Sequence, residues 1–260
     1  MKKIIVFLLL FPLAINAQYA LAEFIVLNEG MESEYHKLEK VWGAWHENSI
    51  EKGEKSGWAV WKRTATENDN ENAAHYVVFN QFSTKEQMDN YINNGDTFSM
   101  NKAVSVMKSK LKGMSTGSIK KIVGLEPKIK KQVRAYHLQL LDATPFTGGD
   151  LKVGDKMTFA PMIQKSDDYE QVESYIAKPY FLQQVMNGKH RWWAFTKIIN
   201  RNDNAYKELT HIAWNIFVPN SEFDERVVEN EFVQKVLTEK INSSREMRNP
   251  QELTLVYQSN

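Results

Sequence analysis

The sequence WAVWKRTATENDNENAAHYVVFNQF, from Trp58 to Phe82, decides the fold because the chain contains it twice. A second copy, WAFTKIINRNDNAYKELTHIAWNIF, runs from Trp193 to Phe217 at one constant offset of 135 residues (193 − 58) and without a gap. Each copy has two apolar runs separated by an Asn- and Asp-rich segment, the pattern of two strands joined by a turn. Identical residues occupy matched positions in the two copies, among them Trp58 and Trp193, Lys62 and Lys197, Asn80 and Asn215, and Phe82 and Phe217. We therefore expect two related units in one chain.

The composition is that of a globular protein. Of the 260 residues, 42% are apolar and 25% are charged, which is far from the polar composition of disordered chains. The 33 Lys and Arg residues balance 32 Asp and Glu residues, so the chain has no general electrostatic reason to bind nucleic acid. The absence of cysteine excludes disulfides, a thiol nucleophile and an iron–sulfur cluster.

Residues 1–17 have the pattern of a secretory signal peptide. Lys2 and Lys3 form a charged start, and a short apolar run follows from Ile4 to Ile15. That run is too short to span a bilayer. We expect cleavage near Ala17 and an exported protein, either periplasmic or secreted.

The predicted elements follow the order β-α-β-β-α-β in each half. We place the first unit at residues 18–126 and the second at 132–260, joined by a short lysine-rich linker. The apolar residues of Ser118–Leu125 suggest the last strand of the first unit. Ala143–Gln164 reads as a loop of 22 extra residues that covers one end of the second unit. Because closure entropy grows slowly with loop length, we expect its deletion to cost little stability.

Two β-α-β-β-α-β units with aromatic-rich second strands resemble the dimeric α/β-barrel superfamily, here as a duplicated ferredoxin-like fold. That group includes antibiotic-biosynthesis-type monooxygenases, NIPSNAP-like and EthD-like proteins, and the haem-binding chlorite dismutase and dye-decolourising peroxidase branch. The resemblance covers nearly all of residues 19–258. It implies an α+β fold in which two units pair sheet to sheet as a single-chain barrel. A fold of this kind does not by itself specify a function.

The second half carries the residues that we expect to bind a ligand. Strand alternation puts His211 and Asn215 on one face, beside the predicted helix Asp168–Met186, with Tyr136 and Trp193 as aromatic neighbours. Some cofactor-free monooxygenases of the superfamily use an Asn and a Trp near the substrate, which is what the resemblance adds here. The alternative is structural: the aromatic rings fill the core, and the amides hydrogen-bond to neighbouring loops.

The histidines show no metal-binding pattern. None of the six forms HExxH or another known ligand spacing, and only His137 and His211 lie in strands that could approach each other. In the haem-binding branch, the axial His usually comes from a second helix. The corresponding predicted helices, 84–112 and 221–242, contain no His. We therefore expect neither a metal nor a cofactor.

The leading functional hypothesis is an exported barrel that binds a small, largely apolar molecule in an aromatic pocket. One alternative is a cofactor-independent oxygenase or a related enzyme of the same superfamily. A second is a structural or interaction protein whose interior is filled by its own side chains. We expect no nucleic acid partner and no membrane span, and either a monomer or a homodimer.

Overall fold

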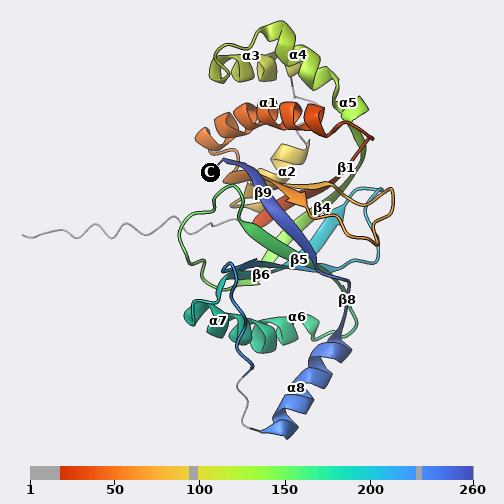
Figure 1. Ribbon diagram of the computed structural model, residues 1–260, viewed down its shortest axis with the longest axis vertical. Coiled ribbons are helices and arrows are strands. Elements are labelled where there is room, and N and C mark those ends of the chain that lie inside the picture. The colour runs from red at the N-terminus through yellow and green to blue at the C-terminus, as the bar shows by residue number, and fades with distance from the viewer. Residues whose placement is uncertain (1–17, 94–98, 227–229, 260) are drawn as a thin grey trace, which may run out of the picture.

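The computed structural model describes residues 18–93, 99–226 and 230–259, and the predicted signal peptide lies outside them. Within this part of the chain, eight antiparallel strands close into a barrel with helices above and below it (Figure 1). The barrel strands are β1 (Tyr19–Leu27), β2 (Gly57–Arg63), β3 (Tyr76–Phe82), β4 (Lys130–Ala143), β5 (Lys156–Gln164), β6 (His190–Arg201), β7 (His211–Phe217) and β9 (Gln251–Ser259). A short strand, β8 (Arg245–Met247), adds to the free part of β5.

The strand order has an internal symmetry. The first four strands pair in the order β4-β1-β3-β2, and the last four pair in the matching order β9-β5-β7-β6. Contacts of β2 with β9 and of β4 with β6 join the two sets and close the barrel. The two hairpins predicted from the repeated sequence are β2–β3 and β6–β7, so that prediction is confirmed.

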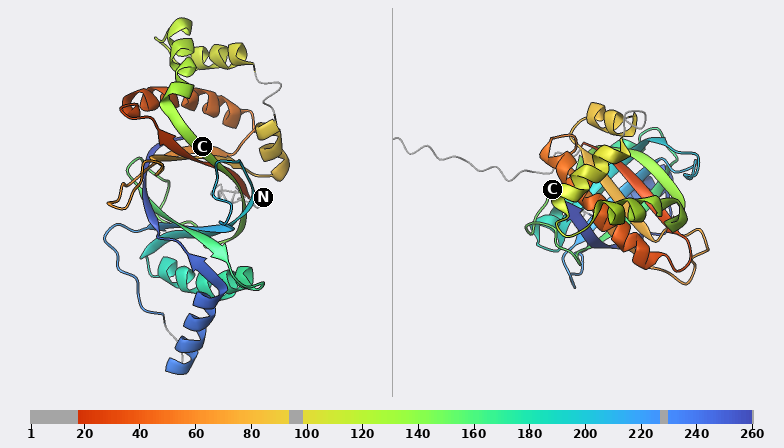
Figure 2. Two further views of the ribbon diagram at one scale, coloured as in Figure 1. Left: turned by 90° about the vertical axis from the view of Figure 1, so that its right-hand side faces the viewer. Right: turned by 90° about the horizontal axis from the view of Figure 1, so that it is seen from above.

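The helices form two layers on opposite sides of the barrel. The first layer contains α1 (Glu32–Glu51), α2 (Lys85–Asn93), α3 (Met100–Lys110), α4 (Thr116–Gly124) and α5 (Glu126–Ile129). The second contains α6 (Tyr169–Val172), the π-helical turn η2 (Glu173–Ala177), α7 (Lys178–Met186) and α8 (Glu231–Ser244). The left view of Figure 2 shows the barrel as a ring between these layers.

Strand alternation divides the apolar residues between the barrel interior and the helix layers. Phe24, Phe159 and Trp214 belong to the buried cluster inside the barrel. Trp58 packs between the first sheet and α1, and Trp193 packs between the second sheet and its helices. The molecule therefore has three apolar layers, and either side of each sheet could hold a site.

The predicted strand Ser118–Leu125 is wrong. The segment is α4, because the Ser115 side chain accepts a hydrogen bond from the Ser118 amide and caps the helix. Ile119 and Val123, four residues apart, then lie on one face and pack with residues of α1 and α3. A short apolar run is compatible with either a strand or a helix. In this segment, the Ser115 cap favours the helix.

The predicted loop Ala143–Gln164 is also wrong, because it contains β5. Met157 and Phe159 face the barrel interior, whereas Ala160 and Met162 face the helices. This strand pairs with both β7 and β9. The 22 extra residues were an artefact of comparing β1 with β4; β5 is the strand that holds the position of β1 in the second set.

Three further elements bear on the predicted boundaries. β4, which the predicted boundary assigns to the second unit, pairs with β1 as well as with β6. α8 begins later than expected, at the Asn230 cap. The π-helical turn just before Pro179 interrupts the α-helix there, as expected for a proline inside a helical pattern. In the described ranges, no helix is long and apolar enough to cross a membrane.

Candidate functional site

The structure does not bring the four predicted site residues together. Tyr136 faces the barrel interior, where its hydroxyl accepts a hydrogen bond from the Tyr206 amide. Trp193 lies in the apolar cluster between sheet and helices on the opposite side of the wall. His211 also contacts that cluster, since its ring stacks on Phe195 with 5.0 Å between centroids. Tyr136 is therefore separated from the others by the sheet itself.

His211 is held by its own contacts. Its Nδ1 lies 2.9 Å from Thr210 Oγ1, and its Nε2 lies 3.3 Å from Glu170 Oε1. Burial lowers the pKa of His211 to about 4, although the Glu170 carboxylate opposes that shift. The side chain is thus a neutral, hydrogen-bonded imidazole at pH 7, and the structural interpretation of this residue fits best.

The repeat does bring together a different set of residues, once in each half. Trp58 lies opposite Asn80 across the first hairpin, and Trp193 lies opposite Asn215 across the second. Two more positions obey the same sequence offset and lie beside these pairs. We call the four residues of each half a quartet: His46, Lys55, Trp58 and Asn80 in the first, and Phe181, His190, Trp193 and Asn215 in the second.

In the first quartet, a buried lysine connects the other polar groups. Lys55 is only 2% exposed, and its Nζ lies 2.5 Å from His46 Nδ1. The same ammonium group donates to Asn80 Oδ1 at 2.6 Å and lies 4.9 Å from the centre of the Tyr91 ring. The His46 ring stacks on Trp58 with 4.9 Å between centroids. A basic nitrogen is therefore fixed beside an imidazole, an amide and the Tyr91 ring, and the imidazole in turn stacks on Trp58.

Burial shifts the pKa of this lysine into the working range of an acid–base group. Desolvation lowers the pKa of Lys55 to about 7, and Glu23 only partly opposes the shift. Desolvation, with the Lys55 charge as the next cause, lowers the pKa of His46 well below its usual value. Burial raises the pKa of Glu23, whose carboxylate acts on the Lys55 charge. Opposed shifts of this kind gather at functional sites, because they let groups exchange protons near neutral pH.

Two residues next to this quartet are accessible and desolvated at the same time. Glu23 accepts a 3.4 Å hydrogen bond from Asn80 Nδ2, and Tyr91 lies against Lys55. Both side chains keep part of their surface exposed. Desolvation nevertheless raises the pKa of each. Glu23 and Tyr91 are thus the half-buried side chains that lie next to Lys55.

The second quartet is more apolar. His190 is fully buried, and its ring contacts Phe181, Phe217 and Phe223 at centroid distances of 5.0–5.6 Å. Among the described residues, neither ring nitrogen of His190 nor Oδ1 of Asn215 has a hydrogen-bond partner. Desolvation lowers the pKa of His190 to about 4, and the nearby Asn215 amide only partly opposes this. The Asn215 amide is thus close to the imidazole without the geometry of a hydrogen bond.

Sequence reasoning missed Lys55, His46 and His190 because it compared identical residues only. Lys55 and His190 differ in type, although both are basic nitrogens at matched positions. The signal was available: reading the segment before each hairpin at the established offset would have paired them. What the two halves share at these positions is a buried base beside an Asn.

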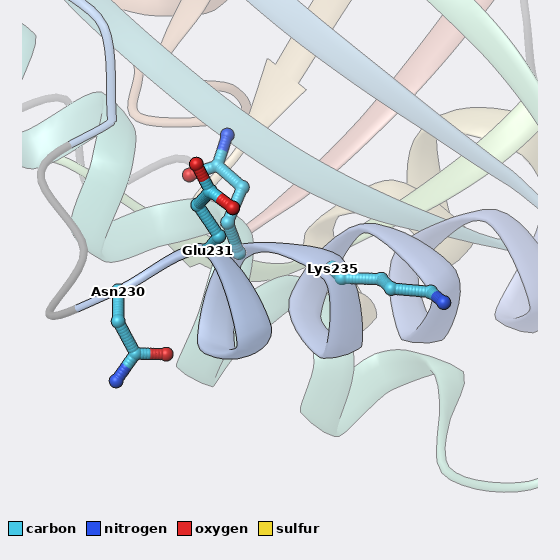
Figure 3. A pocket seen from close by; sticks show the side chains of 4 residues that line it. Asn230, Glu231 and Lys235 are labelled. Atoms are coloured by element: carbon cyan, nitrogen blue, oxygen red, sulfur yellow. The ribbon is translucent and has the colours of Figure 1, made fainter.

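The surface hollow in Figure 3 is of a different kind. It is lined by Asn230, Glu231, Gln234 and Lys235 at the start of α8. All four residues are exposed, and the hollow is open to solvent. It lacks the buried polar groups of a binding site. No group of three or more His, Asp and Glu side chains that could hold a metal was found among the described residues.

Comparison with known proteins bears on the fold. No family model matches the chain, and no curated protein matches it. Among solved structures, the chain is similar to an anthrone oxidase-like protein, with 9% identity, a TM-score of 0.52, and coverage of 93% of this chain and 92% of the other. It is equally similar to a candidate monooxygenase from Fusobacterium nucleatum subsp. nucleatum ATCC 25586, with 9% identity, a TM-score of 0.52 and 93% coverage of both chains. At this identity the similarity shows the fold alone: the chain is an α/β barrel built like those of monooxygenase-type proteins.

Proposed function

We propose that the chain is an enzyme of the dimeric α/β-barrel superfamily, built from two ferredoxin-like units with their boundary in residues 144–155. Its activity is that of a cofactor-independent oxygenase acting on a small, largely apolar aromatic molecule. The shared strand order of the two halves supports the two units. The names of the similar structures, an anthrone oxidase-like protein and a candidate monooxygenase, support the reaction class.

The observation that carries this proposal is the contact of Lys55 with His46 and Asn80 inside a desolvated layer. With a pKa of about 7, the Lys55 amine is neutral in a large fraction of molecules at pH 7 and can accept a proton. His46 and Asn80 fix the position of the amine, so that its lone pair is presented in one direction. A charged surface lysine could not act as a base under these conditions.

The proposed reaction begins when Lys55 takes a proton from an activated carbon next to an aromatic carbonyl system. The resulting anion transfers electrons to dioxygen. Overall, a methylene carbon loses its two hydrogens and becomes a carbonyl carbon. One atom of dioxygen becomes the carbonyl oxygen, and the other leaves as water with the two hydrogens. Trp58 Nε1–H, which has no partner within the described ranges, is a donor for the developing negative charge.

Oxygen consumption with anthrone as substrate tests this proposal. We expect Lys55→Met to reduce the rate by at least about 100-fold, the usual contribution of a positioned base. The matched control is Lys62→Met, because Lys62 lies on β2 but makes an exposed ion pair with Glu32. Equal rates for the wild type and Lys55→Met would refute the proposed role of Lys55.

Export remains part of the proposal. It rests on the charged and apolar pattern of residues 1–17. Mass spectrometry of the mature protein from its natural source should show an N-terminus near Gln18. An intact Met1 would contradict it.

A further inference from the structure

The outermost helices of the first layer carry a strong excess of positive charge. Residues 100–131, which contain α3, α4 and α5, include nine lysines and one acidic residue, Glu126, for a net charge of +8. The rest of the chain has 24 basic (33 − 9) and 31 acidic (32 − 1) residues, for a net charge of −7. The chain is therefore close to neutral as a whole but electrically polarised, and a local field of this kind attracts anionic partners.

Six of these lysines are exposed and lack a counter-charge. We call them the lysine face: Lys102, Lys108, Lys112, Lys120, Lys121 and Lys128. Within the described ranges, the ion pairs of residues 100–131 involve only Lys110, Lys130 and Lys131. Elsewhere, eleven of the fifteen described lysines form ion pairs, so the lysine face differs from the rest of the surface. Lys120 of α4 donates to Asn101 Oδ1 of α3 at 3.1 Å, which shows that lysines of both helices share one surface.

The opposite sides of α3 and α4 are occupied by packing within the chain. Their buried residues pack with α1: Ala103, Val104, Met107, Ile119 and Val123. Figure 1 shows these two helices beyond α1, at the end of the molecule opposite α8. The lysine face is therefore the outer surface at this end, and it offers a partner charge rather than an apolar groove.

The residue types on this surface favour an anionic membrane over a nucleic acid. Residues 100–131 contain no arginine and no aromatic residue. Base edges of a duplex are read mostly by arginine, and single strands are bound by stacking on aromatic rings. Lysine ammonium groups on flexible stems suit diffuse, mobile charges instead, and a cluster of about four to eight basic residues is typical of binding to anionic lipids.

Apolar side chains accompany the lysines. Met100, at the start of α3, is 42% exposed, and Leu111 and Met114 lie half-buried at the turn between α3 and α4. Amphipathic helices on membrane surfaces combine lysines with apolar side chains that enter the boundary between headgroups and acyl chains. We propose that the lysine face binds the chain peripherally to a membrane surface rich in anionic phospholipids. The six ammonium groups neutralise headgroup phosphates, Met100 and the α3–α4 turn enter the headgroup layer, and the barrel stands above it.

Sedimentation with lipid vesicles tests this inference. The chain from Gln18 onward keeps every described element and omits the apolar run Ile4–Ile15, which could bind lipid by itself. In about 0.1 M salt, we expect it to sediment with vesicles of equal parts phosphatidylglycerol and phosphatidylcholine, but not with vesicles of phosphatidylcholine alone. In about 1 M salt, where the Debye length falls to about 3 Å, the binding should be lost. No binding to the phosphatidylglycerol vesicles, or equal binding to both compositions, would overturn the inference.

Matched charge variants locate the surface. The triple change Lys108→Gln, Lys120→Gln and Lys121→Gln should weaken vesicle binding about 100-fold, because each lysine near an anionic surface contributes about fivefold. All three side chains are exposed, so the variant should keep the wild-type fold, which circular dichroism verifies.

The control removes the same charge from exposed positions of the second half. It carries Lys152→Gln, Lys207→Gln and Lys235→Gln, and it should bind vesicles as the wild type does. Equal losses in the two triple variants would reveal an effect of net charge alone and overturn the assignment to the lysine face.

Competition with duplex DNA distinguishes a lipid surface from a nucleic acid. We expect DNA, at a phosphate concentration equal to that of the phosphatidylglycerol, to leave most of the chain on the vesicles. Release of the chain from the vesicles by DNA would assign the lysine face to a nucleic acid and overturn the membrane proposal. Lys55→Met lies outside this surface and should bind vesicles as the wild type does, so the inference is independent of the proposed oxygenase activity.

Discussion

Lys55 and His190 occupy matched positions of the repeat, but their side chains make different contacts. Each is a buried base next to an Asn, but of the two, within the described residues, only Lys55 makes side-chain hydrogen bonds of good geometry. The lysine has a flexible stem and reaches two partners, whereas the rigid imidazole of His190 reaches none. The first quartet is therefore a closed polar network, and the second is an open one.

This difference predicts unequal effects of the same substitution. Asn80→Ala removes the acceptor of the buried Lys55 ammonium group and should lower the free energy of unfolding by about 1–3 kcal/mol. Asn215→Ala removes an oxygen that has no partner and should cost less than about 1 kcal/mol. Urea unfolding of the two variants measures both values. A larger loss for Asn215→Ala would show that its amide is satisfied in solution.

The burial of His190 predicts that the folded chain loses stability in acid. The pKa of His190 is about 4 in the folded chain and about 6.5 in the unfolded chain, so the unfolded state binds more protons between these values. Its contribution to stability is complete above pH 6.5 and disappears as the pH falls through about 4. Between pH 7 and pH 4.5, the wild type should lose about 2–3 kcal/mol more than His190→Phe does. Parallel pH profiles for the two proteins would contradict this.

At the scale of elements, the sequence predicted the hairpins and misassigned their neighbours. The hairpins were predictable because β2–β3 and β6–β7 repeat without a gap. β5 was hidden because Pro161 interrupts its apolar pattern and a glycine-rich segment precedes it. α4 was misassigned because the cap at Ser115 was overlooked. The candidate site was only partly predictable: Trp193 and Asn215 belong to a quartet, but only a position-by-position comparison reveals Lys55 and His190.

The correct assignment of β5 reverses the expected effect of deleting Ala143–Gln164. Removing Lys156–Gln164 would leave β7 and β9 without their shared neighbour and should abolish cooperative unfolding. Shortening the loop that precedes this strand should cost little, because closure entropy depends weakly on length. Circular dichroism during heating distinguishes the outcomes. A cooperative transition in the strand-deleted chain would contradict the barrel.

The packing of α1 on the first quartet predicts a position-specific effect of alanine. A Cβ added at Gly43 would lie 3.3 Å from the Trp58 ring, closer than ordinary contact. Gly43→Ala should therefore lower the free energy of unfolding by about 1 kcal/mol, although alanine favours helices. At Gly124 of α4, an added Cβ meets nothing, so Gly124→Ala should leave stability unchanged or raise it by up to about 1 kcal/mol. Equal gains in both variants would show that Trp58 has room to move.

At the scale of the molecule, closure of the barrel couples the two halves. β9, at the end of the chain, pairs with β2 of the first set and β5 of the second. A chain that ends before Gln251 would lose both contacts and expose two sheet edges, which invites aggregation. We expect this truncated chain to lose cooperative unfolding as a whole, measured by tryptophan fluorescence in urea. Independent unfolding of an intact first half would instead show two separable domains.

An NMR titration of the protein with 13C-labelled lysine measures whether the first half holds a buried base at Lys55. The resonance absent from Lys55→Met identifies this side chain among the lysines. We expect it to titrate near pH 7, because burial lowers the pKa of Lys55. A Lys55 resonance that titrates near the ordinary lysine pKa of about 10.4 would show that this amine is charged at pH 7 and cannot act as the base.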